Sequence, residues 1–365
     1  MDYWRQQLPS ENLPYCTLKL GVAIAIALIC FKRTRPSGPG HGSHQNYWID
    51  RVHPELKAPP TITIDSWWKV YLLNMLNLIP CKTMPGVKMT KVKGIGVYYH
   101  PANNSKDHED DAPAQMIMWI HGGGRIVGSA ANFAECLICS KIVLMFGVPV
   151  LAADYRKPSK HPFPAALDDI HRAYHWLAKK VRGGGRIAVS GLSAGGGLAA
   201  ELCQRLLDEH REGGHRCELV PLPACQLLLD PMLDDRTCVN GTVLELPPHI
   251  LWNAKSNLFA WSQYLGPHHE PGSVNLPKYA SASRREDLSG LPPALILVGE
   301  LDLFHEECTK YARRLIEHGV ETEFVVTEGG FHAFMSMSPN DGPAVECWGR
   351  FHAFGKRFMF DQIDS

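Results

Sequence analysis

The sequence has no excess of charge of either sign. Lys and Arg together number 37 of the 365 residues, and Asp and Glu also number 37. A chain without net charge produces no long-range field that attracts a polyanion. The composition therefore argues against a nucleic-acid partner and against polyanionic substrates.

The sequence also lacks the cysteine pattern of a disulfide framework or a zinc site. Its 11 cysteines are scattered and odd in number, which favours reduced, buried thiols. One Cys-x-x-Cys occurs at Cys136 and Cys139, inside the apolar run "AECLICSKIVLMFG", and no second Cys or His pair follows nearby. We interpret both thiols as helix-packing residues, with metal binding or redox work as the alternative, and expect no metal or cofactor.

An uninterrupted apolar run long enough to span a membrane is absent as well. The segment from Leu13 to Phe31 is broken by Lys19, and its unbroken part after that lysine, Leu20 to Phe31, is 12 residues long. A membrane-spanning helix needs about 20 residues. The segment lacks a basic region before it and a clear cleavage site after it, which disfavours a secretory signal. Two readings stay open: a membrane anchor through residues 13–31, or a helix packed on the domain or lying at an interface. The localisation is accordingly either cytoplasmic or membrane-associated, and the oligomeric state is unknown.

The rest of the chain has the pattern of one large α/β domain. The stretch "RPSGPGHGSHQ" is a linker, so we divide the chain into an apolar segment with linker, 1–45, and a domain over 46–365. Beyond residue 85, strand-like and helix-like runs alternate, which predicts a mainly parallel sheet covered by helices on both faces. The expected strands are 88–100, 115–121, 148–155, 186–191, 225–231, 294–300 and 321–328, and the expected helices are 163–181, 194–210, 305–319 and about 343–358.

One serine lies where an expected strand meets an expected helix. Gly191-Leu192-Ser193-Ala194-Gly195 fits Gly-x-Ser-x-Gly, a tight turn that holds a nucleophilic hydroxyl outward at a helix amino terminus. The pattern alone is weak, because a chain with 32 glycines also forms glycine-serine turns by chance. A structural turn is the alternative interpretation.

A second glycine motif strengthens the catalytic interpretation. His121-Gly122-Gly123-Gly124 directly follows the strand-like "MWI". Glycines let the backbone approach a bound carbonyl closely and present amide hydrogens to it, as an oxyanion hole requires. A phosphate-binding loop is disfavoured because no Lys-Ser/Thr pair follows.

The acid and the base that a serine nucleophile needs follow in the expected order. Asp302 comes after the strand-like "ALILVGE", and His332 comes after "ETEFVVTE". Both positions fall at the carboxyl edge of the expected sheet, on the same side as Ser193. Glu300 competes with Asp302 as the acid, and His305 competes with His332 as the base.

With these residues the chain resembles the hormone-sensitive-lipase-like family of α/β-hydrolases, which includes bacterial esterases, arylacetamide deacetylases and plant carboxylesterases. The resemblance runs from about Met116 to Phe334 and rests on "HGGG", "DYRKPSKHPFPAALDD", "GLSAGGGLAA", "DPMLDDRT", "YASASRREDLSGLPPALILVGELDLF", "YARRLIEHGV" and "GGFHAF". It implies an α/β-hydrolase fold with a catalytic triad and an oxyanion hole. The implied triad is Ser193, Asp302 and His332, and the implied oxyanion donors are the amides of Gly122, Gly123 and Ala194.

The resemblance also implies a helical cap, built from about 46–85 and 234–287. The aromatics of the second segment are interpreted either as pocket lining or as cap core: Trp252, Phe259, Trp261 and Tyr264. The chain departs from the family pattern at Leu192, at Arg125 and in the stretch from Tyr155 to Lys160. Leu192 stands where the family often has an acidic residue, and Arg125 stands where an aromatic often follows the glycines. We expect Arg125 to form a surface salt bridge, with a substrate carboxylate as the alternative partner.

The function implied is that of a serine carboxylic-ester hydrolase that acts through an acyl-enzyme on small to medium esters, without a cofactor. The same triad serves an amidase, a lactonase or a lipase. A non-catalytic ligand-binding member of the fold is a further alternative. His332 argues against that alternative, because the plant hormone receptors that resemble this family lack the catalytic histidine.

Overall fold

The structure is a computed structural model that describes residues 51–56, 63–75, 82–102, 112–213, 220–239 and 251–361. The chain divides into two compact units, Met1–Ser43 and His44–Ser365, and every described residue belongs to the second. The apolar segment 13–31 lies outside the described residues. Within the described part of the chain, no helix combines the length and the apolar character that crossing a membrane requires.

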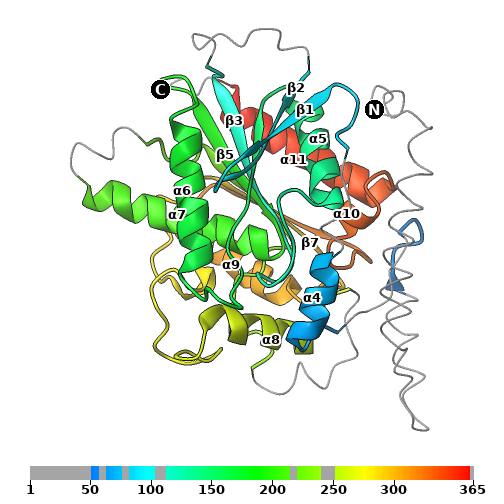
Figure 1. The fold of residues 1–365 in the computed structure, drawn as a ribbon, viewed down its shortest axis with the longest axis vertical. Helices are drawn as coiled ribbons and strands as arrows, with labels where there is room; N and C mark the ends of the chain where they lie inside the picture. The colour runs from blue at the N-terminus through cyan, green and yellow to red at the C-terminus, as the bar shows by residue number, and fades with distance from the viewer. Residues whose placement is uncertain are drawn as a thin grey trace. The chain divides into compact units, whose positions relative to one another are not determined.

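An eight-stranded sheet forms the centre of the second unit, in the order β1-β2-β4-β3-β5-β6-β7-β8 (Figure 1). From β4 through β8 all neighbours are parallel, whereas β1 pairs with β2 and β2 pairs with β4 antiparallel. The prediction of a mainly parallel sheet is therefore confirmed. The strands are β1 Val87–Val92, β2 Gly96–Pro101, β3 Gln115–Ile120, β4 Val150–Ala153, β5 Arg186–Leu192, β6 Cys225–Leu229, β7 Ala294–Gly299 and β8 Thr322–Thr327.

The first expected strand was wrong in one respect. Residues 88–100 do not form one strand but the hairpin β1–β2, which turns at Gly94. Gly94 has φ 71°, a left-handed conformation that glycine adopts without the steric penalty of a Cβ. The alternation of side chains continued on both sides of this turn, so that the periodicity alone did not reveal it.

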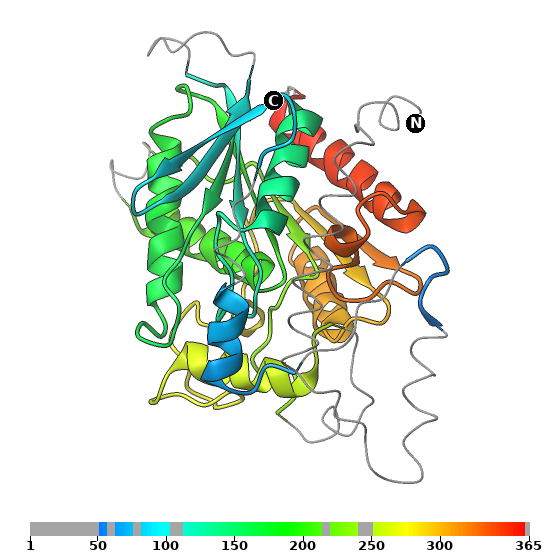
Figure 2. The same cartoon turned by 45° about the vertical axis from the view of Figure 1, so that its right-hand side comes forward.

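Helices cover both faces of the sheet, as predicted (Figures 1 and 2). One face carries α5 (Phe133–Phe146) and α11 (Gly342–Met359), and the other carries α6 (Ala165–Ala178), α7 (Ala194–Glu212) and α9 (His305–Glu317). The remaining described helical elements are α4 (Trp67–Met75), α8 (Ala254–Leu265), the 3-10 turn Ala282–Arg284 and α10 (Phe334–Met337).

The core consists of two apolar clusters separated by the sheet. Strand β3 shows how the sequence divides them, because side chains alternate across a strand. Met116, Met118 and Ile120 join the cluster under α6, α7 and α9. Ile117 and Trp119 join the cluster under α5 and α11. Both faces of the strand are apolar, as in a sheet buried on both sides.

The Cys-x-x-Cys lies on α5, and both thiols are buried, as expected. Cys139 is a free thiol. Cys136, however, is disulfide-bonded, so the expectation of reduced cysteines is wrong at this residue.

Helices α4 and α8 lie side by side at one end of the second unit (Figures 1 and 2). The Trp67 indole Nε1 donates a hydrogen bond of 3.0 Å to Gln263 Oε1, and the rings of Trp67 and Phe259 meet edge to face at 6.0 Å. A segment that precedes the sheet is thus packed against a segment inserted between β6 and β7.

Candidate active site

Ser193 occupies a strained turn between β5 and α7. Its φ of 57° and ψ of −121° lie outside the regions that residues with side chains favour. The turn needs glycines on both sides: a Cβ on Gly191 would lie 2.4 Å from the carbonyl carbon of Gly195, and a Cβ on Gly195 would lie 2.0 Å from the Ile120 oxygen. The Gly-x-Ser-x-Gly pattern therefore reflects steric contacts around the serine.

The three residues of the expected triad come together from three different loops. His332 Nε2 lies 2.9 Å from Ser193 Oγ, and His332 Nδ1 lies 2.7 Å from Asp302 Oδ2. The other Asp302 oxygen accepts the Phe304 amide at 2.9 Å, which fixes the carboxylate. With Nδ1–H donated to Asp302, Nε2 is left to accept the Ser193 proton. All three side chains are buried, so water competes little for these bonds.

The two rival residues lie elsewhere. Glu300 forms an ion pair with Arg51 and accepts the Gly329 amide at 2.9 Å. Its carboxylate therefore stabilises the loop that precedes His332. His305 is the first residue of α9, and its backbone amide donates to the Asp302 backbone oxygen at 3.1 Å, whereas the imidazole bonded to Ser193 and Asp302 is that of His332.

The sequence analysis missed Asp230, a buried carboxyl at the end of β6. Its Oδ1 accepts the Gly299 amide at 3.2 Å, and its Oδ2 accepts the Ala333 amide at 3.0 Å. Gly299 precedes the loop of Asp302, and Ala333 directly follows His332, so Asp230 ties the acid loop to the base loop. Burial and the neighbouring Asp302 raise the pKa of Asp230 well above its usual range. The signal for this residue was its position at the carboxyl end of the expected strand 225–231, the same edge at which the other site residues lie.

The glycine loop after β3 approaches Ser193 closely. A Cβ on Gly122 would lie 3.5 Å from Ser193 Cβ. Burial raises the pKa of Glu135 to about 7, and the Trp119 indole, which donates to this carboxylate, and the Gly122 backbone oppose that rise. By contrast, the amides of Gly123 and Gly124 donate to no other described residue.

Arg125 corrects the expectation of a surface salt bridge. Its guanidinium is fully buried and donates two hydrogen bonds to Glu201 of α7, at 3.1 and 2.7 Å. It also stacks on Trp261 and Tyr264 of α8, at 4.4 and 4.1 Å from the ring centres. Arg125 therefore joins the glycine loop, the nucleophile helix and α8, and it is not available to a substrate carboxylate.

The same contacts decide between the two interpretations of the inserted aromatics. Trp261 and Tyr264 are core residues around Arg125, and Phe259 packs on Trp67. Trp252 differs from them, because its ring centre lies 6.5 Å from that of His332. A Cβ on Gly124 would lie only 2.3 Å from this indole, so Trp252 lines the space between the glycine loop and the base.

Leu192, which also departs from the family pattern, packs into the apolar cluster under α5 and α11.

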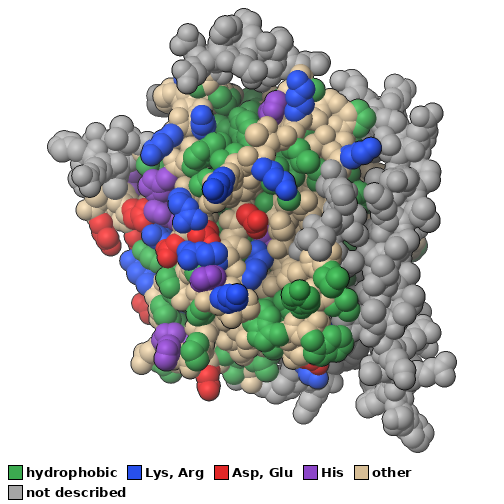
Figure 3. Space-filling view, viewed as in Figure 1, with side chains coloured by type: hydrophobic (Ala, Val, Ile, Leu, Met, Phe, Trp, Pro, Cys, Tyr) green, Lys and Arg blue, Asp and Glu red, His purple; other side chains and the backbone are tan. Residues whose placement is uncertain are grey.

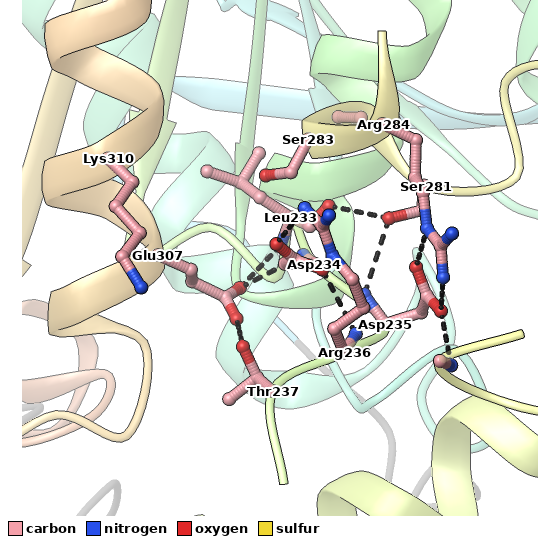
Figure 4. A network of polar contacts seen from close by, with 12 residues as sticks. Leu233, Asp234, Asp235, Arg236, Thr237, Ser281, Ser283, Arg284, Glu307 and Lys310 are labelled. Carbon is pink, nitrogen blue, oxygen red and sulfur yellow. Dashed lines mark hydrogen bonds and ion pairs between the residues drawn. The ribbon is translucent and has the colours of Figure 1, made fainter. Parts of the chain in front are cut away.

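The two ends of the segment inserted after β6 are held together by buried charges (Figure 4). Asp235 receives two hydrogen bonds from Arg284, at 2.8 and 2.7 Å. Glu307 of α9 accepts the Leu233 amide at 2.6 Å and the Thr237 hydroxyl. The base of the insertion, from which the segment that contains Trp252 and α8 extends, is thereby fixed to the scaffold.

Comparison with known proteins agrees with this fold. A family model described as an alpha/beta hydrolase fold matches residues 117–336. The chain belongs to the hormone-sensitive-lipase-like family of α/β-hydrolases. Relatives named as esterases and carboxylic ester hydrolases support a hydrolase of the carboxylesterase type.

Two curated relatives illustrate the family. The chain is 30% identical to ethyl acetate hydrolase of Pseudomonas putida over 234 residues, which are 60% of this chain and 66% of that protein. It is 28% identical to an acetyl-hydrolase of Streptomyces hygroscopicus over 65% of this chain and 75% of the relative. The chain thus spans about two thirds to three quarters of the length of these relatives.

Solved structures share the fold. A bacterial heroin esterase superposes with a TM-score of 0.71 at 24% identity, covering 86% of this chain and 99% of the esterase. Esterase LipW from Mycobacterium marinum gives a TM-score of 0.68 at 23% identity, covering 86% and 98%. At these identities the likeness concerns the fold alone.

Proposed function

We propose that the protein is a serine carboxylesterase that cleaves short-chain acyl esters through an acyl-Ser193 intermediate. The observation that carries this proposal is the hydrogen-bonded series from Ser193 through His332 to Asp302, with contacts of 2.9 and 2.7 Å. His332 takes the hydroxyl proton as Ser193 attacks the ester carbonyl, and it returns that proton to the leaving alcohol. Water then hydrolyses the acyl-enzyme by the same route.

We assign the oxyanion hole to the amides of Gly123, Gly124 and Ala194. The sequence predicts Gly122 in this role, and we prefer Gly124 because the Gly122 backbone helps to lower the pKa of the buried Glu135 carboxyl. The amides of Gly123 and Gly124 have no acceptor among the described residues, and Ala194 begins α7, where backbone amides lack a partner within the helix. Such donors stabilise the oxyanion in the transition state. In this assignment the Gly122 amide does not bind the oxyanion.

The preference for a short acyl chain rests on Trp252. Its indole lies beside His332 and against Gly124, where it limits the space for an acyl or alcohol group. The names of the two relatives, an ethyl acetate hydrolase and an acetyl-hydrolase, point in the same direction. We propose that α4 and α8 together form the cap over this space.

The test is steady-state hydrolysis of p-nitrophenyl esters from acetate to decanoate. We expect the highest kcat/KM for acetate or butyrate, and no activity above background for Ser193→Ala. Trp252→Leu is expected to shift the preference toward longer chains, while the exposed Trp68→Leu leaves the profile unchanged. Equal turnover by wild type and Ser193→Ala contradicts the mechanism. An unchanged chain-length profile in Trp252→Leu contradicts the role of the indole.

A further inference from the structure

Three potential metal ligands meet on the outer side of α6 and α7. His171 and His175 are four residues apart on α6, so their side chains lie on one face of that helix. Glu209 comes from the last turns of α7. His171 Nε2 lies 2.7 Å from Glu209 Oε2 and 3.1 Å from His175 Nε2, and His175 Nε2 lies 4.0 Å from the same Glu209 oxygen.

These separations bracket the edge length of a tetrahedral zinc site. Zinc binds imidazole nitrogen and carboxylate oxygen at about 2.0–2.2 Å, which places neighbouring ligand atoms of a tetrahedron about 3.3–3.5 Å apart. The three observed separations lie on both sides of this value. A cation at the centre therefore requires only small side-chain rotations and no movement of either helix.

A simple His–Glu ion pair explains only part of this arrangement. One imidazole suffices to bond Glu209, yet the Nε2 atom of His175 also lies 3.1 Å from His171 Nε2 and 4.0 Å from the same Glu209 oxygen. The second Glu209 oxygen is held by Arg205 Nε at 3.0 Å, and Arg205 in turn donates to Asp168 at 2.7 Å. Metal-binding carboxylates have this type of supporting hydrogen bond, and it keeps Oε2 directed at the histidines.

The surroundings suit a divalent cation bound to neutral imidazoles. Neutral imidazole nitrogen and carboxylate oxygen are ligands that zinc-class cations bind. Arg205 and Lys179 are the basic groups nearby, and Asp168 offsets Arg205. Figure 3 shows histidine, acidic and basic side chains together over the part of the surface where α6 lies in Figure 1. All three candidate ligands are partly accessible, so an ion can enter from solvent.

We propose that His171, His175 and Glu209 bind a divalent transition-metal ion of the zinc class, with the fourth position open to water. The ion links α6 to α7. Glu209 lies 15 residues beyond Ala194, so the site is about 22 Å from the triad along the helix. Its effect is therefore on the stability of the fold and not on ester hydrolysis.

The test uses the full-length protein, freed of metal by a chelator and then titrated with ZnCl2. We expect 1:1 binding by calorimetry and a melting temperature that rises with zinc. Above the dissociation constant, each tenfold increase in free zinc raises the ratio of folded to unfolded protein tenfold. Substituting Co2+ for zinc should give the visible absorption of a tetrahedral site.

His175→Gln and Glu209→Gln are the test variants, and His210→Gln is the matched control, because His210 is exposed and adjacent to Glu209 on α7. We expect the test variants to lose the zinc-dependent rise in melting temperature and the Co2+ spectrum, and the control to keep both. Hydrolysis of p-nitrophenyl acetate should not change with zinc in any of them. Zinc binding by His175→Gln equal to that of wild type overturns the proposal, as does wild-type binding weaker than about 1 mM, the range of weak metal sites.

Discussion

Replacing Arg125 by methionine is expected to destabilise the fold strongly, because it leaves Glu201 buried without its partner. Both side chains of this pair are fully buried, and two hydrogen bonds join them. Methionine has a similar length and keeps the contact with the rings of Trp261 and Tyr264. The substitution therefore removes the charge while it retains most of the packing.

The magnitude follows from the burial. Breaking a buried ion pair by removing one partner costs about 3–5 kcal/mol, which lowers the ratio of folded to unfolded protein by about two to nearly four powers of ten. Arg313→Met is the matched control, because Arg313 is exposed and lies 3.7 Å from Glu317. An exposed pair of this kind contributes about 0–1 kcal/mol.

The cost in Arg125→Met should depend on pH. Burial raises the pKa of Glu201 to about 7 even beside Arg125. Without the arginine the pKa rises further, so the folded variant holds a proton that the unfolded chain releases above about pH 4.5. Stability then falls as pH rises. We expect the difference between wild type and variant to be larger at pH 8 than at pH 5.5.

Urea unfolding followed by tryptophan fluorescence at these two pH values measures both effects. Adding Glu201→Gln to Arg125→Met should restore part of the lost stability, because a neutral amide is cheaper to bury than a carboxylate. A loss no larger than that of Arg313→Met would refute the reasoning. A double variant less stable than Arg125→Met alone would show that the uncompensated charge is not the cause.

Three further predictions concern the loops around the triad. Gly124→Ala should lower kcat about a hundredfold in p-nitrophenyl acetate hydrolysis, because the new Cβ would meet Trp252 at 2.3 Å and displace the oxyanion loop; an unchanged kcat would exclude Gly124 from the oxyanion hole. Asp230→Asn should lower kcat about tenfold or more with little change in KM, because an amide nitrogen cannot accept from Gly299 or Ala333; a change in KM alone would contradict this positioning role. Burial lowers the pKa of Lys157 to about 8, so the unfolding free energy of wild type relative to Lys157→Met should rise by about 1 kcal/mol per pH unit between pH 8 and 10; a pH-independent difference would contradict that shift.

The regular part of the fold was predictable because its strands are buried on both faces. A strand such as β3, "QMIMWI", is apolar throughout, so its place in a covered parallel sheet follows from the residues themselves. The turn at Gly94 was not predictable from alternation, since the same periodicity continues through the hairpin. The packing of α4 on α8 depends on contacts between segments almost 200 residues apart, which local patterns do not encode.

At the site, the predictable residues are those that follow a chemical requirement. A nucleophile, a base and an acid must each stand at a strand end, and the sequence offers few candidates there. The supporting residues follow no such rule. Asp230 and Arg125 have ordinary sequence surroundings, and only the fold shows that one bridges two backbone amides and the other lies between two rings.

The supporting residues also explain how a strained serine can persist. Ser193 holds an unfavourable backbone conformation, which costs of order 1–3 kcal/mol and persists only where surrounding contacts enforce it. The backbone amide of Ser193 donates to the Leu229 backbone oxygen at 2.8 Å, and the backbone oxygen of Ser193 accepts the Met232 amide at 2.9 Å. Asp230 lies between these two partners in the chain and fixes the segment through its own bonds to Gly299 and Ala333. The residues at the end of β6 therefore hydrogen-bond to the nucleophile turn, the acid loop and the base loop. A substitution there should change the position of all three catalytic side chains.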